Sequence, residues 1–260
     1  MTAAVLKTEN LTIRFGGLTA VSALNMECAE GTITSLIGPN GAGKTTVYNM
    51  ITGFYKPTEG RVVFAGEDIT SLKPHEVCQK GIARTFQNIR LFSGGTVLQN
   101  VMTACRVRQK SPWWAAPFML PGFVREEREI REKSLALLEE VGLSHLAGEI
   151  ATGLPYGEQR RLEIARALAT EPKLLLLDEP AAGMNPQESV TLMDFIRNIR
   201  DKFGVTILMI EHDMKVVMGV SEWIRVLDYG RLIAEGTPDE IRSDAKVIEA
   251  YLGKEAANLA

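Results

Sequence analysis

One eight-residue segment has the residue types needed to bind a polyphosphate. Residues 38–45 read GPNGAGKT and match the pattern G-x-x-x-x-G-K-[ST] in full. The glycines allow backbone N–H groups to turn inward around phosphate oxygens, and the helix expected after them adds positive potential. The Lys44 ammonium suits the β- and γ-phosphates, and the Thr45 hydroxyl suits Mg²⁺. The alternative, a glycine-rich turn with an exposed lysine, leaves the apolar run before it unexplained.

This loop predicts a nucleoside triphosphate site, with ATP and Mg²⁺ as the expected cofactors. The residues expected to contact the nucleotide are Gly38, Pro39, Asn40, Gly41, Ala42, Gly43, Lys44, Thr45 and Thr46.

An acidic pair follows a second apolar run. Leu174–Leu177 lead directly into Asp178 and Glu179. A buried strand that ends in two carboxylates places them at the carboxyl edge of a sheet, where α/β folds bind ligands. We expect Asp178 to hold Mg²⁺ through water, and Glu179 to orient or deprotonate an attacking water. The alternative is that both carboxylates only solvate a turn.

Two further polar residues suit the same site. Gln87, in the segment RTFQ, has an amide able to reach both Mg²⁺ and the attacking water. His212 follows the apolar run that ends at Glu211, and an imidazole there can hydrogen-bond a γ-phosphate oxygen. Either residue taken alone would fit a capping or solvated role better. Their order along the chain, between and after the other motifs, favours catalytic roles for both.

The elements that must position these groups alternate between strand and helix. Three short apolar runs are typical of strands buried on both faces of a parallel sheet, and two alternating runs predict half-buried antiparallel strands. Helix-forming stretches lie between them, so the pattern indicates an α/β layered core. The buried strands are expected at 34–38, 174–178 and 205–211, the half-buried strands at 11–15 and 61–66, and the helices at 45–51, 158–169 and 187–202.

Residues 93–155 differ from this core because they contain a helix with a solvated face and no convincing strand. We therefore predict an α/β nucleotide-binding core over 1–92 and 156–236, with a helical subdomain inserted at 93–155. Residues 237–240 read TPDE, a pattern typical of a capped helix start. A C-terminal helical extension is expected over 237–260, with a last helix closing near Gly253.

Composition excludes several classes of protein. The 260 residues carry 29 Lys+Arg against 32 Asp+Glu, a formal charge of −3 that argues against a general nucleic-acid binder. Apolar residues make up 45% of the chain, but no run of about 18 apolar residues occurs, so no segment is expected to span a bilayer. The beginning of the chain does not resemble a secretory signal. Three widely spaced cysteines argue against a disulfide framework or a zinc site and favour a reducing cytosol.

The order of these motifs resembles the ATP-binding cassette of ABC proteins over nearly the whole chain. Residues 154–159, LPYGEQ, precede a basic helix and the acidic strand, where that family places its LSGGQ signature. The resemblance implies a P-loop NTPase (RecA-like) core with an antiparallel β subdomain and an inserted α-helical subdomain. It also implies that Phe15 stacks on adenine, although Phe15 alone would fit a core position.

Two departures from the family pattern affect expected nucleotide contacts. Pro155 stands where the family has serine, and Tyr156 stands where it has glycine. The resemblance therefore assigns contact with the partner's ATP to Tyr156, Gly157 and Glu158, and to the dipole of the helix they begin. Asn185 stands where the family has aspartate. It is expected at the nucleotide site, and it also makes a good helix cap.

One branch of the family is especially similar. The segments RFGGLTAV, GFYKPTEG, RTFQNIRLF, LPYGEQRRLEIARAL, DEPAAGMNP and IEHDMKVVM resemble the LivG-type ATP-binding subunits of branched-chain amino-acid importers. ATPases of urea and short-amide importers are similar in many of these segments, and the lipopolysaccharide-export ATPase is similar to a lesser extent. A soluble ABC ATPase acting on DNA or ribosomes and a small P-loop kinase are further alternatives.

The resemblance also implies partners and a location. A second, homologous or identical cassette would pack head to tail with this one, and two transmembrane permease subunits would hold both at the cytoplasmic face of the inner membrane. A solute-binding protein would act indirectly, and no nucleic acid is expected. Arg90, Leu91 and Phe92 are candidates to receive a permease helix. Residues 111–123 either pack within this subunit or contact a membrane subunit or interface.

Overall fold

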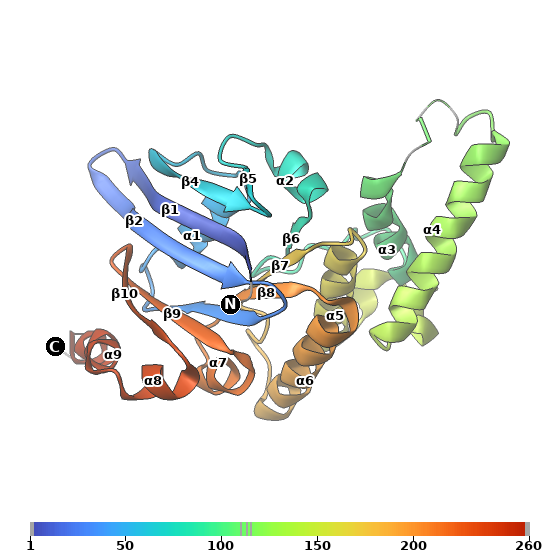
Figure 1. Cartoon of the computed structure of the whole chain (residues 1–260). Coiled ribbons are helices and arrows are strands. Elements are labelled where there is room, and N and C mark those ends of the chain that lie inside the picture. The colour runs from blue at the N-terminus through green and yellow to red at the C-terminus, as the bar shows by residue number, and fades with distance from the viewer. Residues whose placement is uncertain (1–2, 110, 113, 115, 258–260) are drawn as a thin grey trace. The chain divides into compact units, whose positions relative to one another are not determined.

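A four-stranded sheet and a six-stranded sheet form the first of two structural units, which comprises Met1–Arg84 and Lys173–Ala260 (Figure 1). The second unit comprises Thr85–Pro172. The computed structural model describes residues 3–109, 111, 112, 114 and 116–257. Within that range, no helix is both long enough and apolar enough to cross a bilayer.

The four-stranded sheet is antiparallel and has the order β2-β1-β4-β5. It confirms the predicted half-buried strands, and β1 begins well before the expected start because Val5, Leu6 and Thr8 continue its buried side. The strands are β1 (Ala4–Phe15), β2 (Leu18–Ala29), β4 (Glu59–Phe64) and β5 (Glu67–Asp68).

The six-stranded sheet has the order β10-β9-β3-β8-β7-β6 and contains the parallel strands of the nucleotide-binding core. The three predicted apolar strands, β3, β7 and β8, are buried along their whole length and pair in parallel, as expected. The strands are β3 (Ile33–Ile37), β6 (Ile82–Arg84), β7 (Leu174–Asp178), β8 (Thr206–Ile210), β9 (Trp223–Asp228) and β10 (Arg231–Gly236).

Helices cover the sheets of the first unit, and one of them is fixed by a buried phenol. Tyr48 on the helix after the phosphate loop donates to the Leu208 carbonyl at 2.6 Å and to the Leu177 carbonyl at 3.2 Å. Burial raises the pKa of this hydroxyl well above its usual range, so Tyr48 remains a donor. The helices are α1 (Lys44–Ile51), α2 (Pro74–Lys80), α6 (Pro186–Phe203), α7 (Met214–Val220), α8 (Pro238–Ser243) and α9 (Ala245–Ala257).

The C-terminal extension corrects one prediction. A single helix closing near Gly253 was expected after residue 237, but the chain forms two helices separated at Asp244. The Asp244 carboxylate accepts hydrogen bonds from the backbone N–H groups of Lys246 and Val247, at 2.8 and 3.2 Å. Such a side chain competes with helical hydrogen bonding and starts a new helix, so one predicted helix becomes two.

The second unit is helical and covers a longer stretch of the chain, Thr85–Pro172, than the predicted insertion at 93–155. The difference arises because α5, which the prediction placed in the α/β core, packs against α3. Its helices are α3 (Val97–Cys105), α4 (Pro121–Glu140) and α5 (Tyr156–Leu168), with 3-10 turns at Arg106–Arg108, Ser144–Leu146 and Ala151–Gly153.

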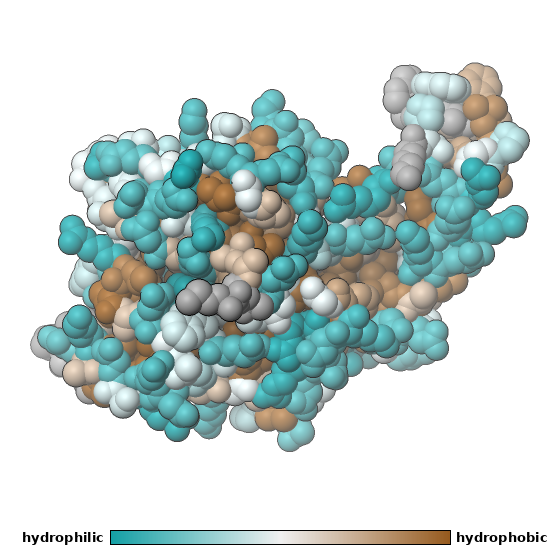
Figure 2. All heavy atoms as spheres, in the orientation of Figure 1, coloured by the Kyte–Doolittle hydropathy of each residue, from teal (hydrophilic) through white to brown (hydrophobic). Residues whose placement is uncertain are grey.

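An exposed apolar segment precedes α4 in the second unit. Phe118 and Met119 are 73% and 65% exposed, and Trp114 is also exposed. Figure 2 shows hydrophobic spheres beside the grey ones in this part of the unit. These side chains do not pack into the described part of the chain, so the structure gives no support there to packing within this subunit. Contact of residues 111–123 with a membrane subunit or interface stays a prediction. Trp113 lies outside the described residues.

Candidate functional site

The phosphate loop connects β3 to α1 and is shaped by glycine. Gly43 has φ +102°, and a Cβ atom there would lie 2.7 Å from the Ala20 carbonyl oxygen, so no larger residue fits without a shift. The Lys44 side chain is buried, and its Nζ donates to the carbonyls of Gly38 and Pro39 at 2.6 and 3.1 Å. The ammonium group is therefore held within the loop, as phosphate binding requires.

A hollow of about 310 Å³ lies over this loop and brings it together with one of the predicted carboxylates. The sequence predictions missed Tyr229, which lies in the turn between β9 and β10. That turn is tied to the phosphate loop because Gly230 N–H donates to the Ala42 carbonyl at 2.9 Å. The lining residues are Leu18, Thr19, Ala20, Asn40, Gly41, Ala42, Gly43, Lys44, Thr45, Thr46, Glu179 and Tyr229.

Asp178 ends β7 and is held by an arginine that sequence reasoning missed. Arg84 Nη2 lies 2.8 Å from Asp178 Oδ2, and both side chains are more than nine-tenths buried. Arg84 Nη1 also donates to Asn49 Oδ1 on α1 at 2.7 Å. The guanidinium stacks on the Tyr48 ring at 5.3 Å. Arg84 therefore orients the Asp178 carboxylate relative to the helix that begins at Lys44.

Glu179 occupies an unusual backbone conformation beside His212. Its φ is +47°, a left-handed conformation that costs a non-glycine residue free energy and is often found at functional sites. Its backbone N–H donates to the Ile210 carbonyl at 2.9 Å, which fixes it against β8. His212 Nδ1 lies 3.7 Å from Glu179 Oε2. The structure thus brings these two predicted catalytic residues together.

A buried carboxylate, Glu211, is a third residue that the sequence predictions missed. Glu211 Oε1 accepts from the Ala181 N–H at 2.8 Å, and Oε2 accepts from the N–H groups of His212 and Asp213 at 2.9 and 3.3 Å. It is almost fully buried. Glu211 therefore joins the loop after β7 to the loop after β8, and so supports the approach of Glu179 to His212.

Phe15 is exposed rather than part of the core. Its ring is 46% exposed and meets the Tyr55 ring edge-on, with the ring centroids 5.5 Å apart. The core alternative for Phe15 is therefore wrong. The hollow's described lining includes Leu18, from the next strand, and does not include Phe15, so stacking of Phe15 on adenine stays a prediction.

Asn185 is the N-cap of α6. Its side-chain oxygen accepts from the N–H groups of Gln187 and Glu188, both at 3.0 Å, and the Asn185 N–H donates to Glu188 Oε2 at 2.8 Å. The predicted capping role is confirmed. Its contact with nucleotide stays a prediction.

In the second unit, a buried arginine joins the main chain at Gln87 to residues 154–159, called the signature turn below because they occupy the place of the family signature. Arg160 on α5 is fully buried and donates to the carbonyls of Phe86 and Gln87 at 2.8 and 2.9 Å. The same guanidinium donates to the Tyr156 hydroxyl at 3.0 Å and to Glu163 Oε2 at 2.7 Å. The backbone of Gln87 and the side chain of Tyr156 are thus held by one group, which sequence reasoning missed.

Glu163 completes this network. Its Oε1 accepts from the N–H groups of Phe86 and Arg90, both at 3.3 Å. Burial raises the pKa of the Glu163 carboxyl, although the charge of Arg160 opposes the shift. Together the two side chains fix the main chain on both sides of Gln87.

The signature turn itself begins α5 at Pro155. The Pro155 carbonyl accepts from the N–H groups of Glu158 and Gln159, both at 3.0 Å. Proline has no N–H, and a helix start is a position where that loss is tolerated. Gly157 and Glu158 lie in the first turn of α5, as predicted.

The donors expected to bind Mg²⁺ have suitable chemistry. Thr45 and Asp178 supply hydroxyl and carboxylate oxygens, and Mg²⁺ uses few protein ligands beside phosphate and water. The Tyr48 hydrogen bond to the Leu177 carbonyl ties α1, which bears Thr45, to the strand that bears Asp178. In the part of the chain that the structure describes, no cluster of three or more His, Cys, Asp or Glu side chains could hold a metal by itself.

Comparison with known proteins gives matches over nearly the whole chain. Residues 21–182 match the family described as ABC transporter, and residues 231–257 match the family described as branched-chain amino acid ATP-binding cassette transporter. The chain is 48% identical over 254 residues to the high-affinity branched-chain amino acid transport ATP-binding protein BraF of Pseudomonas aeruginosa. It is 45% identical over 254 residues to LivG of Escherichia coli, a protein of the same description. Each alignment covers 98% of this chain and 100% of the relative.

Solved structures agree with these matches. The ADP conformation of an ATP-binding cassette from an ABC transporter is similar with a TM-score of 0.84 and 37% identity, covering 97% of this chain and all of the other. A dimeric bacterial ABC transporter cassette is similar with a TM-score of 0.75 and 27% identity, covering 90% of this chain and 98% of the other.

Proposed function

The chain belongs to the ATP-binding subunits of ABC transporters, and we propose that it powers the import of branched-chain amino acids. As a member of this family it binds nucleotide and couples ATP hydrolysis to transport.

The main support for branched-chain amino acids as the solute is the family match at residues 231–257. These residues form β10, α8 and α9 in the first unit, and none of them is among the described lining residues of the nucleotide hollow. The phosphate loop and acidic pair belong to ATP chemistry, so they say nothing about the transported molecule. The full-length identity to BraF and LivG supports the same solute class.

The geometry supports hydrolysis by in-line attack of water on the γ-phosphate. Lys44, held inside the phosphate loop, stabilises the phosphate charge. Glu179 lines the same hollow and orients or deprotonates the attacking water. His212, with Nδ1 3.7 Å from Glu179 Oε2, hydrogen-bonds a γ-phosphate oxygen.

Asp178, Thr45 and Gln87 are the residues that would hold Mg²⁺, Asp178 through water. The ion would neutralise charge on the β- and γ-phosphate oxygens. Arg84 keeps the Asp178 carboxylate in place for this role, and Arg160 and Glu163 keep the main chain of Gln87 in place.

The second cassette in the functional assembly would be identical or homologous to this one. Tyr156, Gly157 and Glu158 would contact the ATP held by that partner, through backbone N–H groups and the N-terminal end of α5. The similarity to a dimeric cassette structure supports this arrangement. Phe15 and Asn185 would complete the contacts of each ATP with its own subunit.

Two transmembrane permease subunits would hold the cassettes at the cytoplasmic face of the inner membrane, with a solute-binding protein acting on the opposite side. The segment at Arg90–Phe92 is suited to receive a permease helix because Arg90 and Phe92 are exposed. Arg166 stacks on the Phe92 ring at 4.6 Å and supports it from α5.

Uptake of labelled solutes tests the proposal. Cells that lack this chain should lose leucine uptake and regain it with the native chain, while urea and short-amide uptake stays unchanged. The matched control is Glu179→Gln, which should bind ATP but hydrolyse it at least about a hundredfold more slowly and fail to restore uptake. Restored urea or amide uptake, with no effect on leucine, would overturn the solute assignment.

Co-purification from solubilised membranes tests the partners. The tagged chain should bring down two hydrophobic permease proteins. Recovery of ribosomes or DNA in their place would favour a soluble ABC ATPase and contradict the transport assignment.

A further inference from the structure

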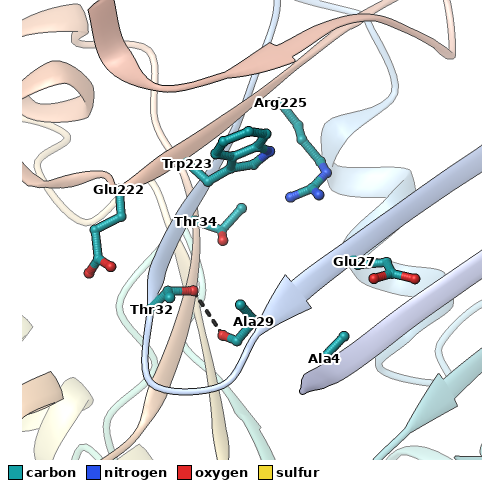
Figure 3. Close-up of a pocket in the computed structure, with 8 residues that line it drawn as sticks. All are labelled: Ala4, Glu27, Ala29, Thr32, Thr34, Glu222, Trp223 and Arg225. Carbon is teal, nitrogen blue, oxygen red and sulfur yellow. Dashed lines mark hydrogen bonds between the residues drawn. The ribbon is translucent and has the colours of Figure 1, made fainter. Parts of the chain in front are cut away.

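A second hollow, of about 380 Å³, lies at the amino ends of β3 and β9 in the first unit (Figure 3). Thr32 and Thr34 line it from the start of β3, and Trp223 and Arg225 line it from β9. The phosphate loop follows the carboxyl end of β3, so this amino-edge hollow is at the opposite end of that strand from the ATP site. None of its lining residues has a role in the activity proposed above.

Arg225 is the unusual residue in the amino-edge hollow. Its side chain is 9% exposed, and among the described residues Nε and Nη1 are buried without a hydrogen-bond partner. The Glu235 carboxylate lies 3.0 Å from Nε but in a poor direction for a hydrogen bond. Because Arg225 lines the hollow and its ion pair with Glu235 is poorly aligned, its positive charge is suited to an anionic group that enters the hollow. Figure 3 shows its guanidinium pointing into the space between Trp223 and Glu27.

Thr32 and two carboxylates supply acceptors to the hollow. The Thr32 hydroxyl donates its hydrogen to the Ala29 carbonyl at 2.8 Å, so its oxygen is left to accept. Glu27 and Glu222 also line the hollow, and they pair with Lys7 and Arg200 respectively. Two carboxylates near one guanidinium repel a polyanion such as phosphate. They suit a ligand that carries an ammonium group as well as one carboxylate.

Trp223 adds an apolar surface. Its indole is partly exposed and lies beside Thr34 and Arg225 in Figure 3. We propose that the amino-edge hollow binds a small α-amino acid with an apolar side chain. Its carboxylate pairs with Arg225, its ammonium group meets Thr32 and the neighbouring carboxylates, and its side chain packs on Trp223.

Strand β9 connects this site to the ATP site. It begins at Trp223 and ends at Asp228, directly before the turn whose Gly230 N–H binds the Ala42 carbonyl of the phosphate loop. Occupancy of the amino-edge hollow is therefore placed to alter ATP turnover. This regulatory role, and the choice of leucine as the probe, rest on the proposed function, since leucine would be an imported product.

Calorimetry on the purified full chain tests binding. Leucine should bind, whereas leucinamide, which lacks the carboxylate, and 4-methylpentanoate, which lacks the ammonium group, should each bind at least about tenfold more weakly. Inorganic phosphate should not compete. Equal binding of 4-methylpentanoate or phosphate would overturn the amino-acid assignment, and no binding of any probe would mean that water alone fills the hollow.

Arg225→Gln should abolish leucine binding, and Arg231→Gln, an exposed arginine on β10, is the matched control that should retain it. If Arg225→Gln fails to fold, Trp223→Ala, at a partly exposed ring, supplies the second variant and should weaken leucine binding. Unchanged leucine affinity in a folded variant would overturn the proposed site.

ATPase measurements with and without leucine test the regulatory role. Leucine should change the turnover of the native chain and not that of Arg225→Gln. Binding without any change in turnover would overturn that role. The binding and ATPase measurements use the isolated chain, which transports nothing. If leucine does not bind or does not change ATP turnover, the proposed transport function is unaffected. If cells show no leucine uptake through this chain, the calorimetry still tests binding at the amino-edge hollow.

Discussion

Arg84 in the first unit and Arg160 in the second are both buried beside a carboxylate, yet they use the guanidinium group differently. Arg84 binds two side chains, with Asp178 at 2.8 Å and Asn49 at 2.7 Å. Arg160 binds Glu163 at 2.7 Å and also donates to the main-chain carbonyls of Phe86 and Gln87. The first arginine therefore orients a carboxylate, and the second holds a segment of backbone.

The two arginines act at opposite ends of the segment 84–87. Arg84 directly precedes residues 85–87, which contain the glutamine proposed to reach the ATP site. Its guanidinium holds the carboxylate proposed to bind Mg²⁺, while Arg160 holds the backbone at Gln87. Arg84 sets the orientation of the Asp178 side chain, and Arg160 sets the backbone conformation at Gln87. Substitutions at the two arginines should therefore have different effects.

The largest effect is expected for Arg160→Met. This change leaves the Glu163 carboxylate and the main-chain carbonyls of Phe86 and Gln87 without their donor, and breaking a buried ion pair in this way costs about 3–5 kcal/mol. Urea unfolding of the purified variant measures the loss. Arg131→Met, at an exposed position on α4, is the control and should change stability by less than about 0.5 kcal/mol. Similar stabilities for the two variants would contradict the role given to Arg160.

Arg84→Met is expected to destabilise less, toward the lower end of the range of about 3–5 kcal/mol, because Arg160 makes more hydrogen bonds, to a carboxylate, a hydroxyl and two main-chain carbonyls. Arg84→Lys is the sharper variant because it keeps the charge and loses the two-pronged geometry. Arg84→Lys should raise the Mg²⁺ concentration needed for half-maximal ATPase activity. An unchanged Mg²⁺ dependence would mean that Arg84 stabilises the fold without orienting Asp178.

Glu163→Gln should cost about 2 kcal/mol, less than either arginine substitution. The amide oxygen still accepts from the N–H groups of Phe86 and Arg90, and the neutral group is easier to bury, but the amide NH2 cannot accept from Arg160 Nη1 and leaves that buried guanidinium without its carboxylate. Burial raises the pKa of the Glu163 carboxyl, so part of the lost ion pair is offset by the lower cost of burying a neutral side chain. Thermal unfolding gives the comparison, and a loss as large as that of Arg160→Met would show that the charge, rather than the hydrogen bonds, holds the segment.

Pro155→Ser is expected to have the smallest effect. Pro155 is exposed at the N-cap of α5, and serine there adds a capping hydroxyl worth about 0.5–1 kcal/mol. ATPase activity should stay the same or rise. A collapse of activity with a normal melting temperature would show that the proline itself sets the shape of the signature turn.

Local patterns explain which parts of the site were predictable. The phosphate loop is eight consecutive residues, and its chemistry depends on glycine freedom and on a strand and helix that the flanking residues specify. The Asn185 cap likewise depends on residues within three positions. The two C-terminal helices were missed because the Asp244 cap interrupts an otherwise helical stretch.

The α/β core, the loop that binds the triphosphate, the strand that ends in Asp178 and Glu179, and the family can all be read from the sequence. These follow from contiguous motifs whose geometry is local. The partners of the buried arginines Arg84 and Arg160, and the position of Tyr229 in the hollow, become visible only in the folded chain. Arg84 and Asp178 are 94 positions apart and Arg160 and Phe86 are 74 apart, so no local pattern indicates that they meet. Long-range pairs are set by how sheets and helices pack, and a buried charge finds its partner only once that packing exists.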